Sequence, residues 1–191
     1  MYGEFKGRVL LHICCAVCAS FSIQRLKEER FSVVGLFYNP NIHPWQEYEE
    51  RRKMLEIIRE KLNVEIIEAE YDVKRWFEEI KGHEADREGG LRCQICWRMR
   101  LEKTLFFMKK LNFDFFTTTL TISPHKNSKK IFEVGRALSS SFLEINFKKK
   151  DGFKKAIEFS KRYNIKRQNY CGCIYSFLER WGKDTIRLIS T

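Results

Sequence analysis

The chain has 191 residues, of which 43% are hydrophobic, and its formal net charge is +11. This size predicts one domain with an ordinary core over residues 1–191 rather than two small domains. No run of roughly 18 apolar residues is present and the first residues are polar, so the sequence predicts neither a membrane span nor a secretory signal. We therefore expect a cytoplasmic protein without a membrane partner.

Short apolar runs alternate with stretches in which apolar residues recur every three or four positions. The runs, which contain many β-branched and aromatic residues, predict strands at residues 8–13, 31–38, 64–69, 113–120 and 142–147. The helical spacing predicts helices at residues 21–30, 45–62, 73–80, 96–111, 127–138 and 174–181, and one that follows residue 151. Asn127 and Asp151 are the expected N-caps of two of these helices.

This alternation predicts an α/β fold with right-handed crossovers and a mainly parallel sheet covered by helices on both faces. Ligands of open α/β sheets bind at the carboxyl ends of the strands. Cys14 and Cys15 follow the first expected strand, Tyr38 and Asn39 follow the second, and residues 121–125 follow a later one. We expect these loops to meet at one crevice.

The seven cysteines fall into three tight groups. They are Cys14, Cys15 and Cys18; Cys93 and Cys96; and Cys171 and Cys173. An odd number of cysteines in a cytoplasmic chain argues against a disulfide framework. Buried thiols that act as small apolar side chains are the simplest alternative. Random placement would rarely produce three such groups, so the pattern favours metal binding.

The cysteine pattern leaves the identity of the metal open. A 4Fe-4S cluster and a structural zinc both usually take four ligands, so seven cysteines suffice for two metal sites, or for one metal and a redox-active pair. The groups are far apart in sequence and one lies at the predicted ligand edge of the sheet, which favours a functional cluster over a local zinc knuckle. The spacing alone does not distinguish iron from zinc, and it assigns no role to Cys18.

Five segments together resemble the cobalamin-independent epoxyqueuosine reductase family over nearly the entire chain. They are residues 11–19 (LHICCAVCA); residues 37–44 (FYNPNIHP) with Glu47, Tyr48 and Arg51; Cys93 and Cys96 with Arg98 and Leu101; residues 118–126 (TTLTISPHK); and residues 167–176 (RQNYCGCIYS). Val17 is a departure, because the family most often has proline there.

The resemblance implies the last step of queuosine biosynthesis, in which epoxyqueuosine at the wobble position of a tRNA anticodon loses its epoxide oxygen. It also implies a 4Fe-4S cluster, an adjacent iron, no cobalamin and an external electron donor. Removal of an epoxide oxygen to leave an alkene consumes two electrons and two protons. A cluster passes electrons singly, and a nearby iron can polarise the oxygen as a Lewis acid.

The position and chemistry of several residues in these segments predict their roles at the site. The expected metal ligands are Cys14, Cys15, Cys93, Cys96, Cys171 and Cys173, and the adjacent iron is expected on the 14–15 and 171–173 segments. His43 is the expected proton donor and Tyr38 a second catalytic residue. The expected substrate contacts are Asn39, beside Tyr38 at the cyclopentane diol; His125 and Lys126 at phosphate; and Arg167, Gln168 and Tyr170 at the modified base.

Simpler explanations exist for several of these residues. Turn formation accounts for Asn39 and packing for Tyr170, while Glu47 and Arg51 have the spacing of an ion pair on a helix surface. His12 precedes the cysteines but lies within a strand, so we expect a hydrogen-bonded core histidine there rather than a ligand.

The excess of 36 Lys and Arg over 25 Asp and Glu predicts a polyanionic partner such as tRNA, because clustered cations release counterions from phosphates. Residues 148–150, all lysine, and Lys126 are the candidate phosphate contacts. A solvated surface explains the same excess about equally well.

Two other functions fit parts of the pattern. An iron-sulfur tRNA thiolase would share the nucleotide-hydrolase-like α/β fold of tRNA-modifying enzymes, but it would need a glycine-rich phosphate loop for ATP after the first strand. Residues 13–16 (ICCA) contain no glycine, so we expect no ATP use. A zinc-stabilised RNA-binding module without catalysis is the second, and it would be colourless, whereas an iron-sulfur protein is brown.

Overall fold

A computed structural model of the protein describes residues 4–182, and its centre is a parallel sheet of four strands in the order β3-β2-β1-β4. The strands are β1 (Gly7–His12), β2 (Phe31–Phe37), β3 (Ile66–Glu68) and β4 (Phe115–Thr118). This arrangement confirms the predicted α/β class with a mainly parallel sheet. The extent of the domain over residues 1–191 stays a prediction.

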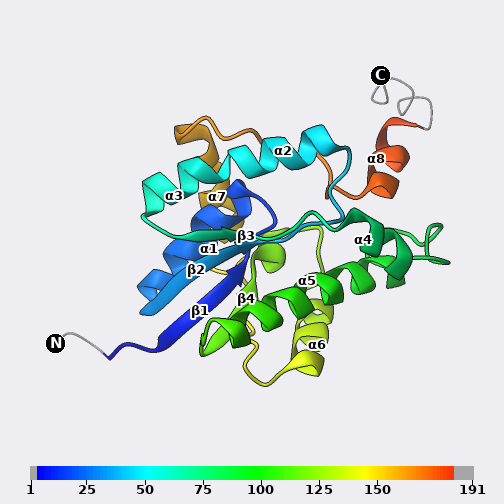
Figure 1. Cartoon of the computed structure of the whole chain (residues 1–191). Helices are drawn as coiled ribbons and strands as arrows, with labels where there is room; N and C mark the ends of the chain where they lie inside the picture. The colour runs from blue at the N-terminus through cyan, green and yellow to red at the C-terminus, as the bar shows by residue number, and fades with distance from the viewer. Residues whose placement is uncertain (1–3, 183–191) are drawn as a thin grey trace.

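Helices cover both faces of the sheet, as Figure 1 shows. They are α1 (Ala16–Glu28), α2 (Trp45–Lys53), α3 (Leu55–Leu62), α4 (Val73–Glu79), α5 (Leu91–Lys110), α6 (Ser128–Leu138), α7 (Gly152–Arg162) and α8 (Ile174–Trp181), with a 3-10 turn η1 (Thr119–Ile122) after β4. Helix α1 packs against α3 and α7 on one face, and α5 packs against α6 on the other. None of the described helices is long and apolar enough to span a membrane.

Strand β1 divides the core between the two faces because successive side chains of a strand point in opposite directions. Val9 and Leu11 are buried with the α1, α3 and α7 side chains, whereas Leu10 is buried with α4 and α5. Both faces of β1 are therefore apolar, as the continuous apolar run at residues 8–13 requires. The buried strand fixes the position of the loop that follows it, which contains the first cysteines.

The expected strand at residues 142–147 is wrong: one bridge, Phe142 with Phe116, is all that forms there. Threonine hydroxyls replace the rest of the ladder. Thr117 Oγ1 donates to the Leu143 carbonyl at 2.8 Å and Thr121 Oγ1 donates to the Ile145 carbonyl at 2.7 Å. These bonds satisfy backbone acceptors that a strand would have paired.

Several helices also differ from their expected limits. The helix expected at 45–62 is two helices that meet at Met54, and α5 begins at Leu91, before the expected residue 96. Asn127 caps α6 as predicted, through bonds from the Lys129 and Lys130 amides to its Oδ1. Asp151 stands at the N-cap of α7 but forms no side-chain cap bond, because its backbone is left-handed there.

Candidate metal centre

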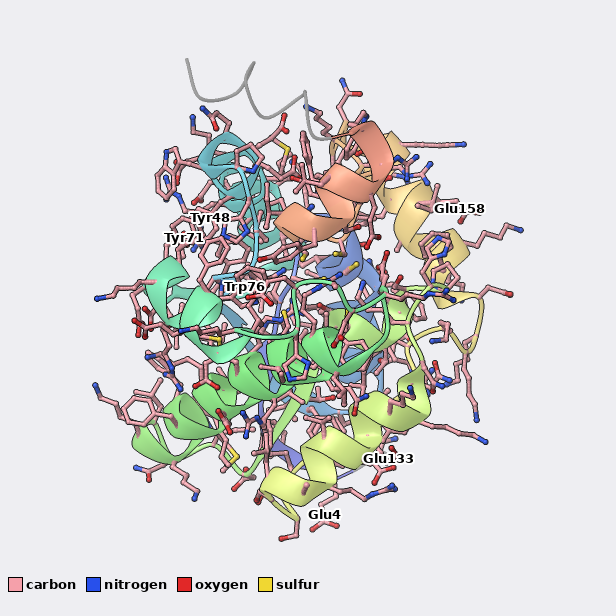
Figure 2. The ribbon with its side chains drawn as sticks, turned by 90° about the vertical axis from the view of Figure 1, so that its right-hand side faces the viewer. Glu4, Tyr48, Tyr71, Trp76, Glu133 and Glu158 are labelled. Atoms are coloured by element: carbon pink, nitrogen blue, oxygen red, sulfur yellow. The ribbon has the colours of Figure 1, made fainter. Side chains whose placement is uncertain are left out.

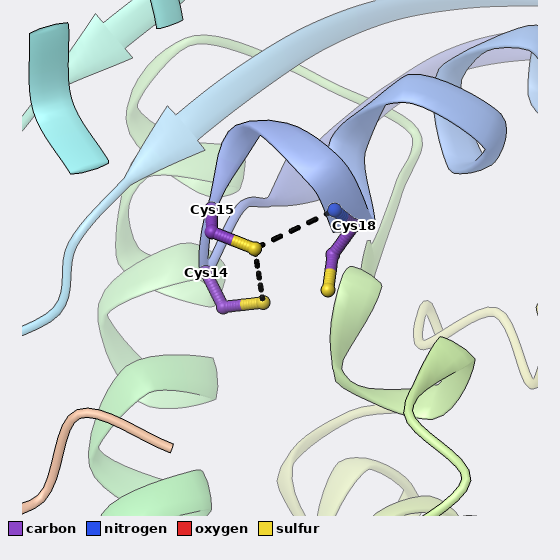
Figure 3. Close-up of side chains that lie close together, drawn as sticks. All are labelled: Cys14, Cys15 and Cys18. Carbon is purple, nitrogen blue, oxygen red and sulfur yellow. Dashed lines mark hydrogen bonds between the residues drawn. The ribbon is translucent and has the colours of Figure 1, made fainter. Parts of the chain in front are cut away.

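Three thiols lie together at the carboxyl end of β1, where α1 begins. The sulfur atoms of Cys14, Cys15 and Cys18 all lie within 4.8 Å of one another (Figure 3). Cys15 is the N-cap of α1, and its Sγ accepts a hydrogen bond from the Cys18 amide at 3.5 Å. The helix start thus brings the third cysteine beside the first two, and we call these three residues the cysteine triad.

Within the triad, the three thiols shift one another's pKa values in opposite directions. Hydrogen bonding from Cys15 and Cys18 lowers the pKa of Cys14, with a further contribution from Lys126. The same interaction raises the pKa values of Cys15 and Cys18. Thr119 adds a hydroxyl 3.3 Å from the Cys14 sulfur. A thiolate is the form of cysteine that binds metals. A lowered pKa at Cys14, beside two further thiols, therefore favours the binding of a metal cation by the triad.

The other four cysteines form a second group, which we call the cysteine tetrad: Cys93, Cys96, Cys171 and Cys173. Cys93 and Cys96 lie on the first turns of α5, and Cys173 is the N-cap of α8. The four residues line one pocket of about 120 Å³. Four thiols from two distant segments around a small pocket match the ligand number of a 4Fe-4S cluster or a zinc ion.

The tetrad is also partly ionised. Hydrogen bonding with Cys173 lowers the pKa of Cys171 to about 6, and Lys126 contributes to this shift. The same bond raises the pKa of Cys173. Burial raises the pKa of Cys93 to about 11, although the Gly89 amide donates to its sulfur at 3.2 Å. Cys14 and Cys171 are therefore the two cysteines whose pKa values are lowered by their neighbours.

Lys126 connects the two groups electrostatically. Its charge contributes to the lowered pKa values of both Cys14 and Cys171, and its side chain lines the tetrad pocket. Cys14 and Cys93 both pack against one buried cluster, which consists of Trp97, Leu120 and Ile131. The triad and the tetrad are thus neighbouring sites.

The segment between Cys171 and Cys173 needs glycine. Gly172 has a φ of +104°, a region that side-chain-bearing residues rarely adopt. An added Cβ would lie 2.9 Å from Ile42 and 3.2 Å from Arg51 Nη1. The Gly172 carbonyl also accepts a hydrogen bond from the His43 amide at 2.7 Å. The Cys-Gly-Cys sequence therefore lets the backbone pass close to the loop after β2.

Three almost fully buried arginines surround the cysteines. Arg51 donates to the carbonyls of Tyr170 and Cys171, both at 3.2 Å, and pairs with Glu47 at 2.6 Å. Arg92 and Arg100 line the tetrad pocket, and Arg100 Nε donates to the Cys96 carbonyl at 3.2 Å. The ion pair expected between Glu47 and Arg51 does form, but Arg51 is only 3% exposed and is not on the surface.

The tetrad pocket suits an anionic, acceptor-rich group. Trp76 and Arg92 both line it, and Trp76 Nε1 and Arg92 Nε are buried N–H groups without a hydrogen-bond partner in the described part of the chain. Buried donors normally have partners, because an unsatisfied one costs about 1–3 kcal/mol. The sulfur atoms of a metal-thiolate group are acceptors, so the donor set and the four thiols fit such a group.

The expected phosphate contacts lie at this pocket. His125 and Lys126 both line it, just before α6. By contrast, Lys148 does not present a free ammonium: its Nζ bonds to the carbonyls of Ser123 and Lys126 and to Ser128 Oγ, at 3.3, 2.9 and 2.6 Å. Lys148 therefore holds the loop that contains Lys126 in place through hydrogen bonds. Lys149 and its neighbour Lys150 are exposed.

The expected contacts to the modified base lie in a different place. Arg167, Gln168 and Tyr170 line a second, open groove between α2 and α8, together with Trp45 and Trp181. The Tyr170 hydroxyl donates to the His43 carbonyl and its ring lies under the Arg51 cation. The structure therefore separates these three residues from His125 and Lys126, and their binding role stays a prediction.

The polar residues after β2 are buried. Asn39 Nδ2 donates to the Ile13 carbonyl at 2.8 Å and its Oδ1 accepts from Arg100 at 3.4 Å. Tyr38 is fully buried, its hydroxyl has no partner among the described residues, and burial raises its pKa. Neither residue lines the tetrad pocket. Their roles toward a substrate stay predictions.

His43 lies in an aromatic surrounding. Its ring centroid is 5.0 Å from that of Trp76 and 5.2 Å from that of Phe77. Tyr48 on α2 and Tyr71 in the loop before α4 lie together, with ring centroids 4.0 Å apart, and Figure 2 labels both with Trp76 on α4. Burial lowers the pKa of His43 to about 4, so the ring is neutral at pH 7 and has one N–H to donate. Its expected role as proton donor stays a prediction.

His12 is a satisfied core histidine, as expected. It is fully buried, and its ring nitrogens contact Thr118 Oγ1 at 2.9 Å and the Tyr38 carbonyl at 3.2 Å. Burial, with a contribution from Arg100, lowers its pKa to about 3. These bonds hold the ends of β1, β2 and β4 together beneath the triad.

Comparison with known proteins identifies the chain. The family model "Epoxyqueuosine reductase QueH" matches residues 9–179. The chain belongs to the QueH family. A QueH enzyme of Acinetobacter baylyi is 36% identical over 192 residues, covering 95% of this chain and 88% of the relative. That of Thermotoga maritima is 34% identical over 181 residues, covering 91% and 92%.

A solved structure shares the fold. The U34-tRNA thiolase NcsA from Methanococcus maripaludis, with its [4Fe-4S] cluster, aligns with a TM-score of 0.55 at 12% identity, over 97% of this chain and 67% of that one. At this identity the likeness concerns the α/β fold alone. It agrees with the expected fold of tRNA-modifying enzymes.

Sequence reasoning gave no role to four residues that the structure places at the cysteine groups: Cys18, Arg51 as a buried group, Arg92 and Arg100. Cys18 had a usable signal, because a residue three positions after an N-cap lies beside the cap on the first helical turn. The sequence contains no signal for the three buried arginines, because their burial depends on how α2 and α5 pack against the cysteine loops.

Proposed function

We propose that this chain reduces epoxyqueuosine at the wobble position of tRNA to queuosine, with electrons from an external donor, in the cytoplasm. The observation that carries the proposal is a cation-lined pocket with four cysteines and a separate group of three close thiols, in a chain that the QueH family model matches over residues 9–179. The reaction removes one oxygen atom and consumes two electrons and two protons.

The two groups would hold different metals. The tetrad offers four thiols, the usual ligand set of a 4Fe-4S cluster, and the triad offers three for a single adjacent iron. When bound, these metals would supply single electrons and a Lewis acid for the epoxide oxygen. This division places Cys18 with Cys14 and Cys15, and Cys171 with Cys173 in the tetrad. It replaces the expectation that the adjacent iron joins the first and last cysteine segments. No residue of this site is proposed to bind cobalamin or ATP.

The remaining residues would bind the nucleotide and supply protons. Lys126, beside both cysteine groups, is the cation placed to meet an oxygen or phosphate of the substrate. His43 and Tyr38 are proposed proton sources, and because the His43 ring is neutral at pH 7 it would act through its single N–H. The open groove with Arg167, Gln168 and Tyr170 would contact the anticodon loop beside the wobble base.

Direct attack of a thiolate on the epoxide is the main mechanistic alternative. In the metal-free chain Cys14 and Cys171 have the lowered pKa values, so they are the better nucleophiles. A covalent tRNA-protein adduct in iron-free protein, detected by mass spectrometry of the quenched reaction, would support this alternative.

Complementation tests the proposal in a cell. A bacterial strain that makes epoxyqueuosine but has lost its own reductase would express either this chain or its Cys93→Ala variant, and tRNA nucleosides would be analysed by mass spectrometry. We expect queuosine with the unchanged chain and epoxyqueuosine with the variant. Sulfur-containing wobble nucleosides would instead indicate a thiolase, and purification of a colourless zinc protein would indicate an RNA-binding module.

A further inference from the structure

Arg100 is a buried cation without a carboxylate. Its side chain lies on α5 one turn after Cys96 and is 4% exposed. Nε donates to the Cys96 carbonyl at 3.2 Å and Nη1 donates to Asn39 Oδ1 at 3.4 Å. Within residues 4–182 no Asp or Glu oxygen lies within 4.0 Å of its guanidinium. Both of its hydrogen-bond partners are neutral.

The two other buried arginines at the site differ in this respect. Arg51 has Glu47 at 2.6 Å, and Arg92 has Glu179 at 3.8 Å. An ionised group that is buried without an opposite charge strongly disfavours the folded state, which is why buried charges are normally paired or bound to metals. Arg100 therefore needs an anion that the described residues do not supply as a carboxylate.

The pocket that Arg100 lines contains the cysteine tetrad. Four thiolates carry four negative charges, and neither a zinc ion nor a 4Fe-4S core cancels all of them. A metal-thiolate group in this pocket would thus be a buried anion, in need of a nearby cation. Arg100 lacks a nearby anion, and the metal-thiolate group would lack a nearby cation. Both lie at the same pocket, so each can supply the charge that the other needs.

We propose that Arg100 is a positioning residue whose buried guanidinium is the counter-charge of the metal-thiolate group held by the tetrad. This inference rests on the metal site of the proposed function but not on its reaction. The hydrogen bond to the Cys96 carbonyl holds the cation against the ligand-bearing turn of α5. The cation stabilises the more negative, reduced form of a cluster more than the oxidised form, so it raises the reduction potential.

The proposal makes opposite predictions for the two states of the protein. In the metal-free chain no carboxylate of the described residues pairs with the buried cation, so its removal should not destabilise the fold. In the loaded chain its removal leaves the anion without its partner. A residue that merely fills space would instead affect both states equally.

Three variants separate these cases. Arg100→Met removes the charge and keeps most of the length, whereas Arg100→Lys keeps the charge. Arg98→Met is the matched control, because it removes a cation from the same helix whose side chain is 50% exposed and paired with Glu79, where water screens the charge. The measurements are the melting temperature with and without metal, the metal affinity and the reduction potential of the reconstituted cluster.

We expect metal-free Arg100→Met to melt at or above the temperature of the unchanged chain, and its metal affinity to fall roughly 10- to 100-fold, the usual effect of removing an outer partner of a metal ligand. Its reduction potential should become more negative, while Arg100→Lys and Arg98→Met stay close to the unchanged chain.

An equal fall in melting temperature with and without metal, failure of the metal-free variant to fold, or an unchanged potential would overturn the proposal. None of these measurements uses tRNA. An unchanged chain that holds metal but leaves epoxyqueuosine intact would therefore contradict the proposed reaction and leave this inference standing.

Discussion

Arg51 donates a hydrogen bond from Nη1 to the carbonyl oxygen of Cys171, a residue 120 positions later, at 3.2 Å. Its Nη2 donates to the preceding carbonyl, that of Tyr170, at the same distance. One buried guanidinium on α2 thus fixes the entry into the Cys-Gly-Cys segment. These hydrogen bonds connect α2 to the last cysteines. We therefore expect a substitution in α2 that breaks them to change the position of Cys171 at the metal site.

Arg51→Met should lower the free energy of unfolding by about 3 kcal/mol, the low end of the range for a broken buried ion pair. The low end applies because the Glu47 side chain, which would lose its partner, is 18% exposed to solvent. Arg52→Met is the control: Arg52 is 38% exposed and its pairs with Glu49 and Glu68 lie at the surface, so we expect less than about 1 kcal/mol. Chemical denaturation measures both. Similar losses in the two variants would contradict the role of Arg51.

Lys148→Met should act on stability, and Lys149→Met on tRNA binding. Loss of the three Lys148 hydrogen bonds should cost about 1–3 kcal/mol. Lys149 is exposed, so its removal should leave stability unchanged and reduce the slope of log affinity against log salt by about one unit, if it contacts a phosphate. Filter binding at several salt concentrations measures the slope. A slope changed by Lys148→Met and not by Lys149→Met would reverse these roles.

His43→Phe should flatten the acid dependence of stability. The folded-state pKa of His43 is about 4, below the ordinary 6.5, so between these values the unfolded chain binds more protons. The neutral ring therefore contributes stability that is complete above pH 6.5 and is lost as the pH falls toward 4, by about 3 kcal/mol at most. Denaturation of the metal-free chain at several pH values measures this. Identical pH profiles for the variant and the unchanged chain would contradict it.

Cys93→Ala and Cys18→Ala should remove different metals. Without Cys93 the tetrad has three thiols, so the cluster iron and the acid-labile sulfide should both be lost. Without Cys18 the triad keeps only Cys14 and Cys15, so iron should fall while sulfide stays. Parallel iron and sulfide analysis of anaerobically purified variants tests the division. Loss of sulfide from both variants in equal measure would show that the seven thiols do not form two sites.

The sequence predicted the sheet and most helices because β1 and β2 are continuous apolar runs and the helices have clear apolar spacing. The run at 142–147 was misleading, since Thr117 and Thr121 satisfy its carbonyls instead of a neighbouring strand. The cysteine spacing predicted metal binding, but not which thiols meet. Cys18 joins Cys14 through the first turn of α1, while Cys171 joins Cys93 only through the packing of α8, the α5 start and the loop held by Arg51. Such contacts between distant segments leave no periodic signal.

Single-turnover conversion by purified protein tests the central claim most directly. The chain would be loaded with iron and sulfide under anaerobic conditions, reduced with dithionite and mixed with tRNA that carries epoxyqueuosine, and the digested nucleosides would be separated and weighed by mass spectrometry. We predict queuosine, one oxygen atom lighter than the substrate nucleoside, with the loaded chain and none with Cys93→Ala. Unchanged epoxyqueuosine in the presence of fully loaded, reduced and tRNA-bound protein would contradict the account.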